Sequence, residues 1–357
     1  QEHGAKPRGG SDRWHSVGQH RRRVAVWPGL WVQTREALQS RGMAVRSDDE
    51  QVEVGFEWIR SHRFVDRCRR FLDEARATGR LEALDHWREL NPDLTISDEP
   101  FADRLAPHAV SAADASRFTG RVRDEGYSLI GPIVPAAAVA RLRRGIERVV
   151  EAGYPPFFVA VYDEFFQIFD GLQALLSPLL GDDYLMVPDG LSAFYAESGD
   201  RGRYKRSLFG PSPPHRDSLG PDPQVVAGVG PSILNVWIPL TDATLDRSCI
   251  YLLPADRDPA YRTDARAVEP SRSALQHVRA CPAAAGSVMA WTTHLVHWGS
   301  LGGEEGAGPR LSVAMYLQNR DVSPFHESAF EIPSRVRFED RLRWISLGLR
   351  GEVFVYP

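Results

Sequence analysis

The chain has 357 residues, of which 43% are hydrophobic and 25% are charged, and its formal net charge is -4 at pH 7. This composition is typical of globular domains and excludes collagen-like, disordered and coiled-coil architectures for most of the chain. The weakly acidic balance argues against a general binder of nucleic acid or of anionic membranes. No apolar run approaches the roughly 20 residues that span a bilayer.

The three cysteines, Cys68, Cys249 and Cys281, indicate the redox environment. Their odd number and wide spacing fit neither a disulfide framework nor a CxxC metal pair. The stretch that follows the arginines at positions 21–23 contains Pro28 and Gly29 and makes a poor signal-peptide core. We therefore expect reduced thiols in a cytoplasmic protein.

The first 110 residues differ in pattern from the rest. Residues 1–23 are rich in Gly, His and Arg and almost lack aliphatic side chains, which predicts a flexible basic arm. Helix-like apolar spacing follows, with Gly79 as a stop, and a short helix is expected over residues 81–90. The sequence thus predicts a helical N-terminal extension over residues 24–110, followed by a main domain over residues 111–357.

The main domain is predicted to place helices before strands. Helices are expected over residues 111–125, from Pro135 onward and over residues 163–180, with a short strand at residues 127–130. After Gly181, six further strands are expected over residues 184–187, 191–197, 233–240, 249–253, 287–297 and 310–317. Consecutive strands without helical spacers argue against a parallel sheet. They favour an α+β fold, a β-sandwich or jelly roll with helices packed on one side.

Two strand-like segments carry histidines that could bind a metal. His215 and Asp217 are two residues apart, so in a strand they point to the same side. The second segment, residues 291–299, contains His294 and His297, which differ by three and face opposite sides of an unbroken strand. Only one of that pair can then look into a pocket, and periodicity alone does not say which.

Arg310 and Ser312 also share one face of a predicted strand. A buried arginine needs a partner, because an unpaired buried charge is very costly. The planar guanidinium suits a carboxylate, so a ligand carboxylate is a natural partner if the protein provides none.

Two histidines and one carboxylate form the facial triad of non-heme iron oxygenases. With the motifs at residues 124–130, 179–183, 235–244, 249–254 and 285–291, and with Arg310 downstream, the region from Ser111 to Gln318 resembles the phytanoyl-CoA dioxygenase family of Fe(II)/2-oxoglutarate-dependent oxygenases. The resemblance implies a double-stranded β-helix, a cupin-like jelly roll with flanking helices. It implies that His215, Asp217 and His297 hold Fe(II), and that Arg310, with Ser312 as a second contact, binds the distal carboxylate of 2-oxoglutarate.

The implied reaction is an O2-dependent oxidation of a small molecule, by hydroxylation, desaturation or rearrangement, in biosynthesis. Candidate substrate contacts are Tyr195, Trp237, Trp298 and Arg206, although aromatic residues on strands are also ordinary core residues. Neither nucleic acid nor a membrane is expected as a partner, and the chain is expected to be a monomer or homodimer.

The chain departs from the family pattern at Pro213 and Ile250, where relatives carry residues that help to hold the keto-acid end of 2-oxoglutarate. Two alternatives therefore stay open. One is an iron oxygenase that uses O2 without 2-oxoglutarate, and the other is a non-catalytic jelly-roll module that binds a ligand.

Overall fold

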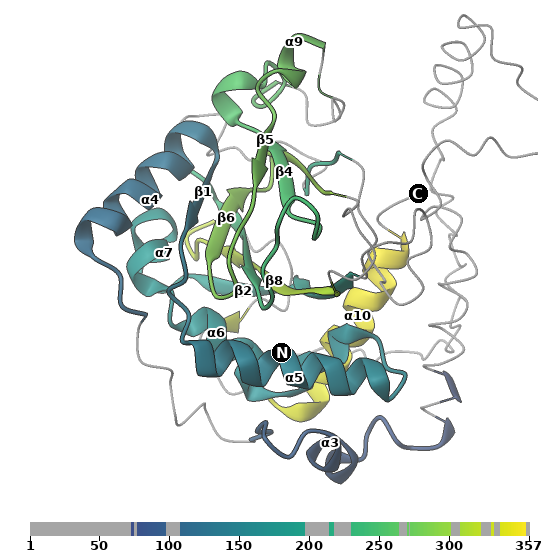
Figure 1. Cartoon of the computed structure of the whole chain (residues 1–357). Coiled ribbons are helices and arrows are strands. Elements are labelled where there is room, and N and C mark those ends of the chain that lie inside the picture. The colour runs from purple at the N-terminus through teal and green to yellow at the C-terminus, as the bar shows by residue number, and fades with distance from the viewer. Residues whose placement is uncertain are drawn as a thin grey trace, which may run out of the picture. The chain divides into compact units, whose positions relative to one another are not determined.

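The structure is a computed structural model that describes residues 73–74, 77–97, 108–196, 214–217, 230–263, 270, 272–300, 308–322, 330–331 and 336–354 (Figure 1). The predicted basic arm and most of the predicted extension lie outside these residues. In the part that is described, no helix combines the length and the apolar character needed to cross a membrane.

The helices of the main domain begin and end largely where the sequence predicts. Helix α4 (Ala112–Glu125) is capped by the Ser111 hydroxyl, which accepts a hydrogen bond from the Asp114 amide at 3.1 Å. It ends at Gly126, whose φ of 79° is a left-handed conformation that glycine adopts readily. Helix α5 (Ala136–Glu151) starts directly after Pro135 and buries an apolar stripe that consists of Val139, Leu142, Ile146, Val149 and Val150.

The predicted helix over residues 163–180 is instead two helices, α6 (Asp163–Asp170) and α7 (Gln173–Leu180). The break falls at Gly171, a weak helix former. The His108 ring packs there, within 2.6 Å of the point that a Cβ would occupy. A short 3-10 helix, η1 (Pro156–Val161), precedes this pair, and α3 (Leu84–Leu90) lies within the residue range predicted for the extension.

The strands form two antiparallel sheets, which confirms the α+β jelly roll. The larger has the order β1-β6-β3-β8-β2-β9 and the smaller the order β5-β4-β7. Their bounds are β1 (Tyr127–Ile130), β2 (Leu185–Ala196), β3 (Ile233–Pro239), β4 (Ile250–Leu253), β5 (Arg279–Cys281), β6 (Val288–Thr292), β7 (Val296–Gly299), β8 (Arg310–Gln318) and β9 (Phe330–Glu331).

Two predicted strand boundaries are wrong. The segments at 184–187 and 191–197 form the single strand β2, whose register against β8 shifts between Val187 and Ser192. The segment at 287–297 is broken by a turn at residues 293–295, so β6 belongs to the larger sheet and β7 to the smaller. The structure also contains elements that the sequence pattern does not predict: β5, β9, the short elements η2 (Ala255–Arg257) and α9 (Arg272–Leu275), and helix α10 (Phe338–Phe354).

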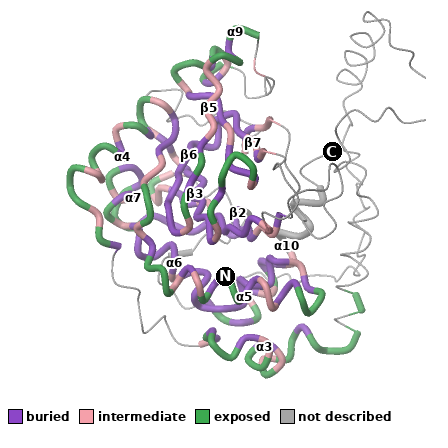
Figure 2. Tube along the Cα trace, viewed as in Figure 1, coloured by how far each residue is buried: buried purple, intermediate pink, exposed green. Residues whose placement is uncertain are grey.

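The two faces of the larger sheet have different surroundings, as expected from the two-residue period of a strand. Side chains such as Leu234, Val236 and Leu311 point outward and join one large apolar core with the helices. The alternate side chains of the same strands, including Trp237, Met289 and Ala314, point inward and form a second buried cluster between the sheets. Figure 2 shows these strands largely buried, while the outer surfaces of α4 and α5 are exposed.

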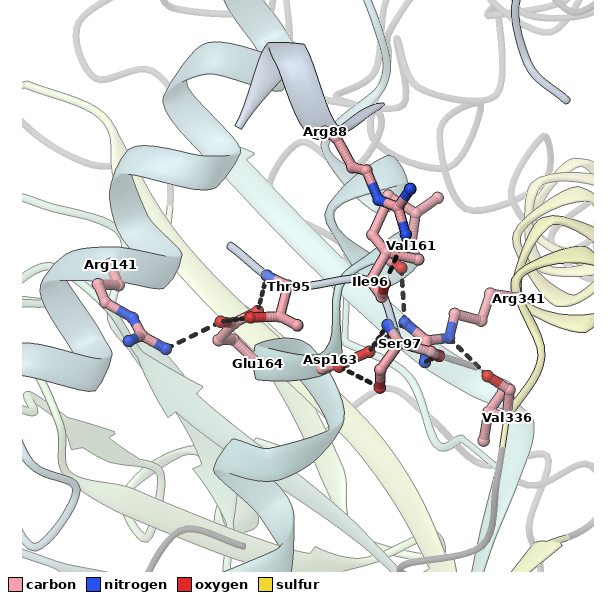
Figure 3. Close-up of polar contacts among 10 residues, drawn as sticks. All are labelled: Arg88, Thr95, Ile96, Ser97, Arg141, Val161, Asp163, Glu164, Val336 and Arg341. Atoms are coloured by element: carbon pink, nitrogen blue, oxygen red, sulfur yellow. Dashed lines mark hydrogen bonds and ion pairs between the residues drawn. The ribbon is translucent and has the colours of Figure 1, made fainter. Parts of the chain in front are cut away.

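A buried polar network fastens residues 95–97 to helices α6 and α10 (Figure 3). Glu164 accepts hydrogen bonds from the amide and hydroxyl of Thr95 at 2.9 and 3.2 Å, and it pairs with Arg141 at 2.8 Å. Asp163 accepts from the Ser97 hydroxyl at 2.6 Å and pairs with Arg341 of α10 at 2.6 Å. Residues 81–97 thus pack into the same core as the predicted main domain.

Candidate metal centre

The segment that carries the HxD motif is joined to β7 through its backbone. His215 and His297 form an isolated antiparallel bridge in which each amide donates to the other's carbonyl at 3.0 Å. This pairing brings two residues that are about 80 positions apart in sequence side by side. Their imidazole centroids lie 4.3 Å apart.

The side chains of His215, Asp217 and His297 converge at one point. Their potential ligand atoms all lie within 4.8 Å of one another, and the Nε2 atoms of His215 and His297 each lie 3.6 Å from Oδ1 of Asp217. Among the described residues, this is the one group of three His, Cys, Asp or Glu side chains with such spacing. Two imidazoles and one carboxylate are donors suited to Fe(II).

The Asp217 carboxylate is held from the larger sheet through its second oxygen. Oδ2 accepts hydrogen bonds from Nδ2 of Asn235 on β3 at 3.1 Å and from Nε1 of Trp291 on β6 at 2.9 Å. Neither residue is predicted from the sequence to have this role. The available signal was a polar Asn235 within an otherwise apolar strand, two residues from Trp237 and therefore on the same face.

The protonation states of the site suit metal binding. Nδ1 of His297 lies 3.1 Å from the Leu295 carbonyl, which can only accept, so Nδ1 carries the proton and Nε2 keeps its lone pair. Burial lowers the pKa of His297 to about 4 even though the Asp217 charge opposes this, so the ring is neutral at pH 7. Burial alone would raise the pKa of Asp217, but the neighbouring His297 and His215 and the Asn235 amide outweigh it and hold that pKa well below its usual value.

The structure also settles which of the two nearby histidines faces the site. His294 lies in the turn between β6 and β7, is 1% exposed, and places Nδ1 3.2 Å from the Tyr261 carbonyl. Its own carbonyl accepts a hydrogen bond from Arg216, which pairs with Asp258 at 2.8 Å. His294 is therefore a packed core residue, and His297 is the one that joins His215 and Asp217.

Arg310 and Ser312 lie on the inner face of the larger sheet, on β8. Arg310 is 5% exposed and donates from Nη1 to the Ser312 hydroxyl at 2.7 Å. Its guanidinium carbon lies 5.6 Å from the centroid of the Phe194 ring and 5.8 Å from that of Trp237. The buried, positively charged guanidinium of Arg310 therefore lies between two aromatic rings inside the jelly roll.

The remaining predicted site residues are not all brought to this interior. Trp237 is buried on the same face as Asn235, whereas Tyr195 packs against the outer, helix-side core. Trp298 stacks on Tyr251 with a centroid distance of 5.8 Å and packs beside the cluster of Leu253, Ala274 and Val296, on the opposite face of β7 from His297. Arg206 and Pro213 lie outside the described residues, and Ile250 is buried in the inner cluster.

The chain is similar to known proteins in sequence and in fold. The sequence matches the family model described as phytanoyl-CoA dioxygenase (PhyH) over residues 122–301, whereas a search of curated proteins finds no match.

Similar solved structures include the epimerase SnoN in complex with Fe3+, alpha ketoglutarate and nogalamycin RO, with 16% identity, a TM-score of 0.41, and coverage of 64% of this chain and 94% of that chain. AviO1 from Streptomyces viridochromogenes Tue57 has 18% identity, a TM-score of 0.41, and coverage of 60% and 99%. The non-heme monooxygenase ThoJ in its Ni complex has 14% identity, a TM-score of 0.47, and coverage of 66% and 98%.

The family match spans half of the chain and includes all three residues that converge in the structure. This protein belongs to the phytanoyl-CoA dioxygenase family of non-heme iron oxygenases.

Proposed function

We propose that this protein is an Fe(II)- and 2-oxoglutarate-dependent dioxygenase of the cytoplasm that oxidises a small molecule in a biosynthetic pathway. The observation that carries the proposal is the convergence of the donor atoms of His215, Asp217 and His297 within 4.8 Å. The buried Arg310 on the same inner face of the jelly roll supports the dependence on 2-oxoglutarate.

The donor set fits Fe(II), and His215, Asp217 and His297 would hold it. Both imidazole Nε2 atoms face Oδ1 of Asp217, and three protein ligands leave positions for a cosubstrate and O2. When bound, iron supplies, with O2 and 2-oxoglutarate, the oxidising power to remove hydrogen from an unactivated C–H bond. The chain's own contribution is to keep His297 neutral and Asp217 ionised, the states in which each can be a ligand.

The residues around Arg310 would bind 2-oxoglutarate. A guanidinium can pair with a carboxylate through two parallel hydrogen bonds, and Ser312 lies 2.7 Å from Nη1 as a second polar contact. Nε1 of Trp237 is buried and has no hydrogen-bond partner among the described residues. Since a buried N–H without a partner is costly, this indole is a further donor for a bound carboxylate or for the substrate.

An anaerobic titration tests the proposal. Fe(II) and then 2-oxoglutarate are added to the purified protein while the visible metal-to-ligand charge-transfer band is recorded. We expect a saturable band in the wild type that is lost in His297→Ala and in Arg310→Ala. Arg320→Ala is the matched control, because that arginine pairs with Asp183 on the surface and should leave the band unchanged.

The other outcomes select the alternatives. Stoichiometric iron binding without a band on addition of 2-oxoglutarate would favour an iron oxygenase that does not use this cosubstrate. Absence of iron binding in the wild type would refute both oxygenase hypotheses and favour a ligand-binding module.

A further inference from the structure

We propose that Asn235 and Trp291 are positioning residues that fix which oxygen of Asp217 faces the metal and so set the affinity of the site. The inference rests on the proposed metal site but not on the use of 2-oxoglutarate. It concerns two side chains that lie behind the carboxylate and donate to the oxygen turned away from the histidines.

The two donors form a pair built into the larger sheet. Asn235 of β3 and Trp291 of β6 are directly opposite each other in the strand register, so their side chains lie on the same face. Both donate to Oδ2 of Asp217, at 3.1 and 2.9 Å. The acceptor comes from residues 214–217, which are not part of either strand.

The two carboxylate oxygens of Asp217 have different neighbours. Oδ2 receives both N–H groups, while Oδ1 lies 3.6 Å from Nε2 of each histidine. The Asp217 side chain is only 4% exposed, so little water can replace a missing donor. Hydrogen bonds to an ionised acceptor are stronger than neutral ones, which makes this orientation well defined. A carboxylate held in this way presents one oxygen to the metal.

Trp291 has a second contact with the site. Its ring centroid lies 4.8 Å from that of His297, so one side chain supports two of the three candidate ligands. Trp291→Phe would remove the N–H donor while keeping an aromatic ring beside His297. Asn235→Leu removes the other donor while keeping the branching and the number of side-chain heavy atoms, and it provides a second, independent variant.

The test measures binding of Co(II), used as an air-stable probe, by calorimetry together with its visible d–d spectrum. Removal of a group that orients a metal ligand typically weakens binding by about 10–100-fold, and we expect a loss in this range for Trp291→Phe and for Asn235→Leu. We also expect an altered d–d spectrum, because a carboxylate freed at Oδ2 can rotate and bind through both oxygens. Thermal unfolding of the metal-free variants checks that they are folded.

Trp87→Phe is the matched control. The Trp87 indole donates to the Leu81 carbonyl at 2.8 Å in the helix-side core, so this variant also loses a buried N–H donor. It should unfold at a lower temperature yet bind Co(II) with wild-type affinity and spectrum. If the control behaves in this way, weaker Co(II) binding in the variants at positions 235 and 291 cannot be attributed to a general loss of stability.

The outcomes separate this inference from the proposed function. If the wild type binds one Co(II), Asp217→Ala does not, and both positioning variants bind within about twofold of the wild type with its spectrum, the inference is wrong while the metal site stands. If the wild type binds no Co(II), the metal site and the inference fall together. Weakened binding in the positioning variants alongside a wild-type Trp87→Phe supports the inference, whether or not 2-oxoglutarate is used.

Discussion

Arg341 of α10 is predicted to be one of the most sensitive positions for stability. Its side chain is fully buried and makes an ion pair with Asp163 at 2.6 Å. It also donates to the carbonyls of Val161 at 2.7 Å, Val336 at 3.0 Å and Ser97 at 3.3 Å (Figure 3). Replacement by methionine keeps much of the volume but leaves a buried carboxylate without its counter-charge.

The expected loss can be estimated from these contacts. Removal of one partner of a buried ion pair costs about 3–5 kcal/mol. Ser97 still donates to Asp163 from its hydroxyl at 2.6 Å and from its amide at 3.3 Å, which favours the lower half of that range. For a chain of this size a loss of about 3–4 kcal/mol corresponds to a decrease in Tm of about 5 °C.

Urea denaturation of three variants provides the assay. Arg341→Met should lose about 3–4 kcal/mol, and the double variant Arg341→Met with Asp163→Leu should be more stable than the single variant, because the unpaired charge is gone. Arg337→Met is the control, since Arg337 is 61% exposed and its ion pairs with Glu339 and Asp340 lie on the surface, where such a change is worth at most about 0.5 kcal/mol. A loss below about 1 kcal/mol for Arg341→Met would refute the reasoning.

Two further predictions concern buried ionisable groups. Arg216→Met should lower the free energy of unfolding by about 3–5 kcal/mol, because it leaves Asp258 buried and unpaired. Adding Asp258→Leu should restore part of the loss, and a double variant that is less stable in urea than the single variant would contradict this reasoning. Burial raises the pKa of Cys281 to about 12, so the folded state disfavours the thiolate. The thiol therefore contributes to stability below its unfolded-state pKa of about 8.5, and this contribution is lost as the pH rises toward the folded-state pKa. Between pH 9 and 10.5 the wild type should therefore lose about 1.4 kcal/mol per pH unit more than Cys281→Ala in urea denaturation, and identical slopes would exclude this cause.

Much of the fold could be predicted because its signals are local. The start and end of α4 follow from Ser111 and Gly126, and the apolar stripe of α5 is visible in its spacing. The HxD pair is equally local, since two residues in an extended segment share a side whatever the rest of the chain does. Periodicity does not choose between His294 and His297, and it is the family resemblance that implies His297 as the third metal ligand.

What could not be predicted depends on contacts between distant parts of the chain. The turn at residues 293–295 moves His297 into a different sheet from Trp291, and no residue type in that segment requires the break. The pairing of Asn235 with Trp291 needs the register of β3 against β6, which the sequence does not encode locally. Helix α10 is not predicted for a related reason: the interactions that bury Arg341 come from residues 97, 161 and 163, far away in the sequence.

The break between β6 and β7 has a thermodynamic consequence. His297 belongs to the smaller sheet, whereas the Asp217 carboxylate is fastened to the larger one, and His215 lies about 80 positions before His297. A metal ion held by these three side chains would act as a reversible cross-link that closes a long loop and joins the two sheets. Binding energy would then appear as resistance to unfolding, growing with the logarithm of the free metal concentration above the Kd. Chelation should accordingly loosen the β4–β7 sheet before it affects the helix-side core, which amide hydrogen exchange can resolve.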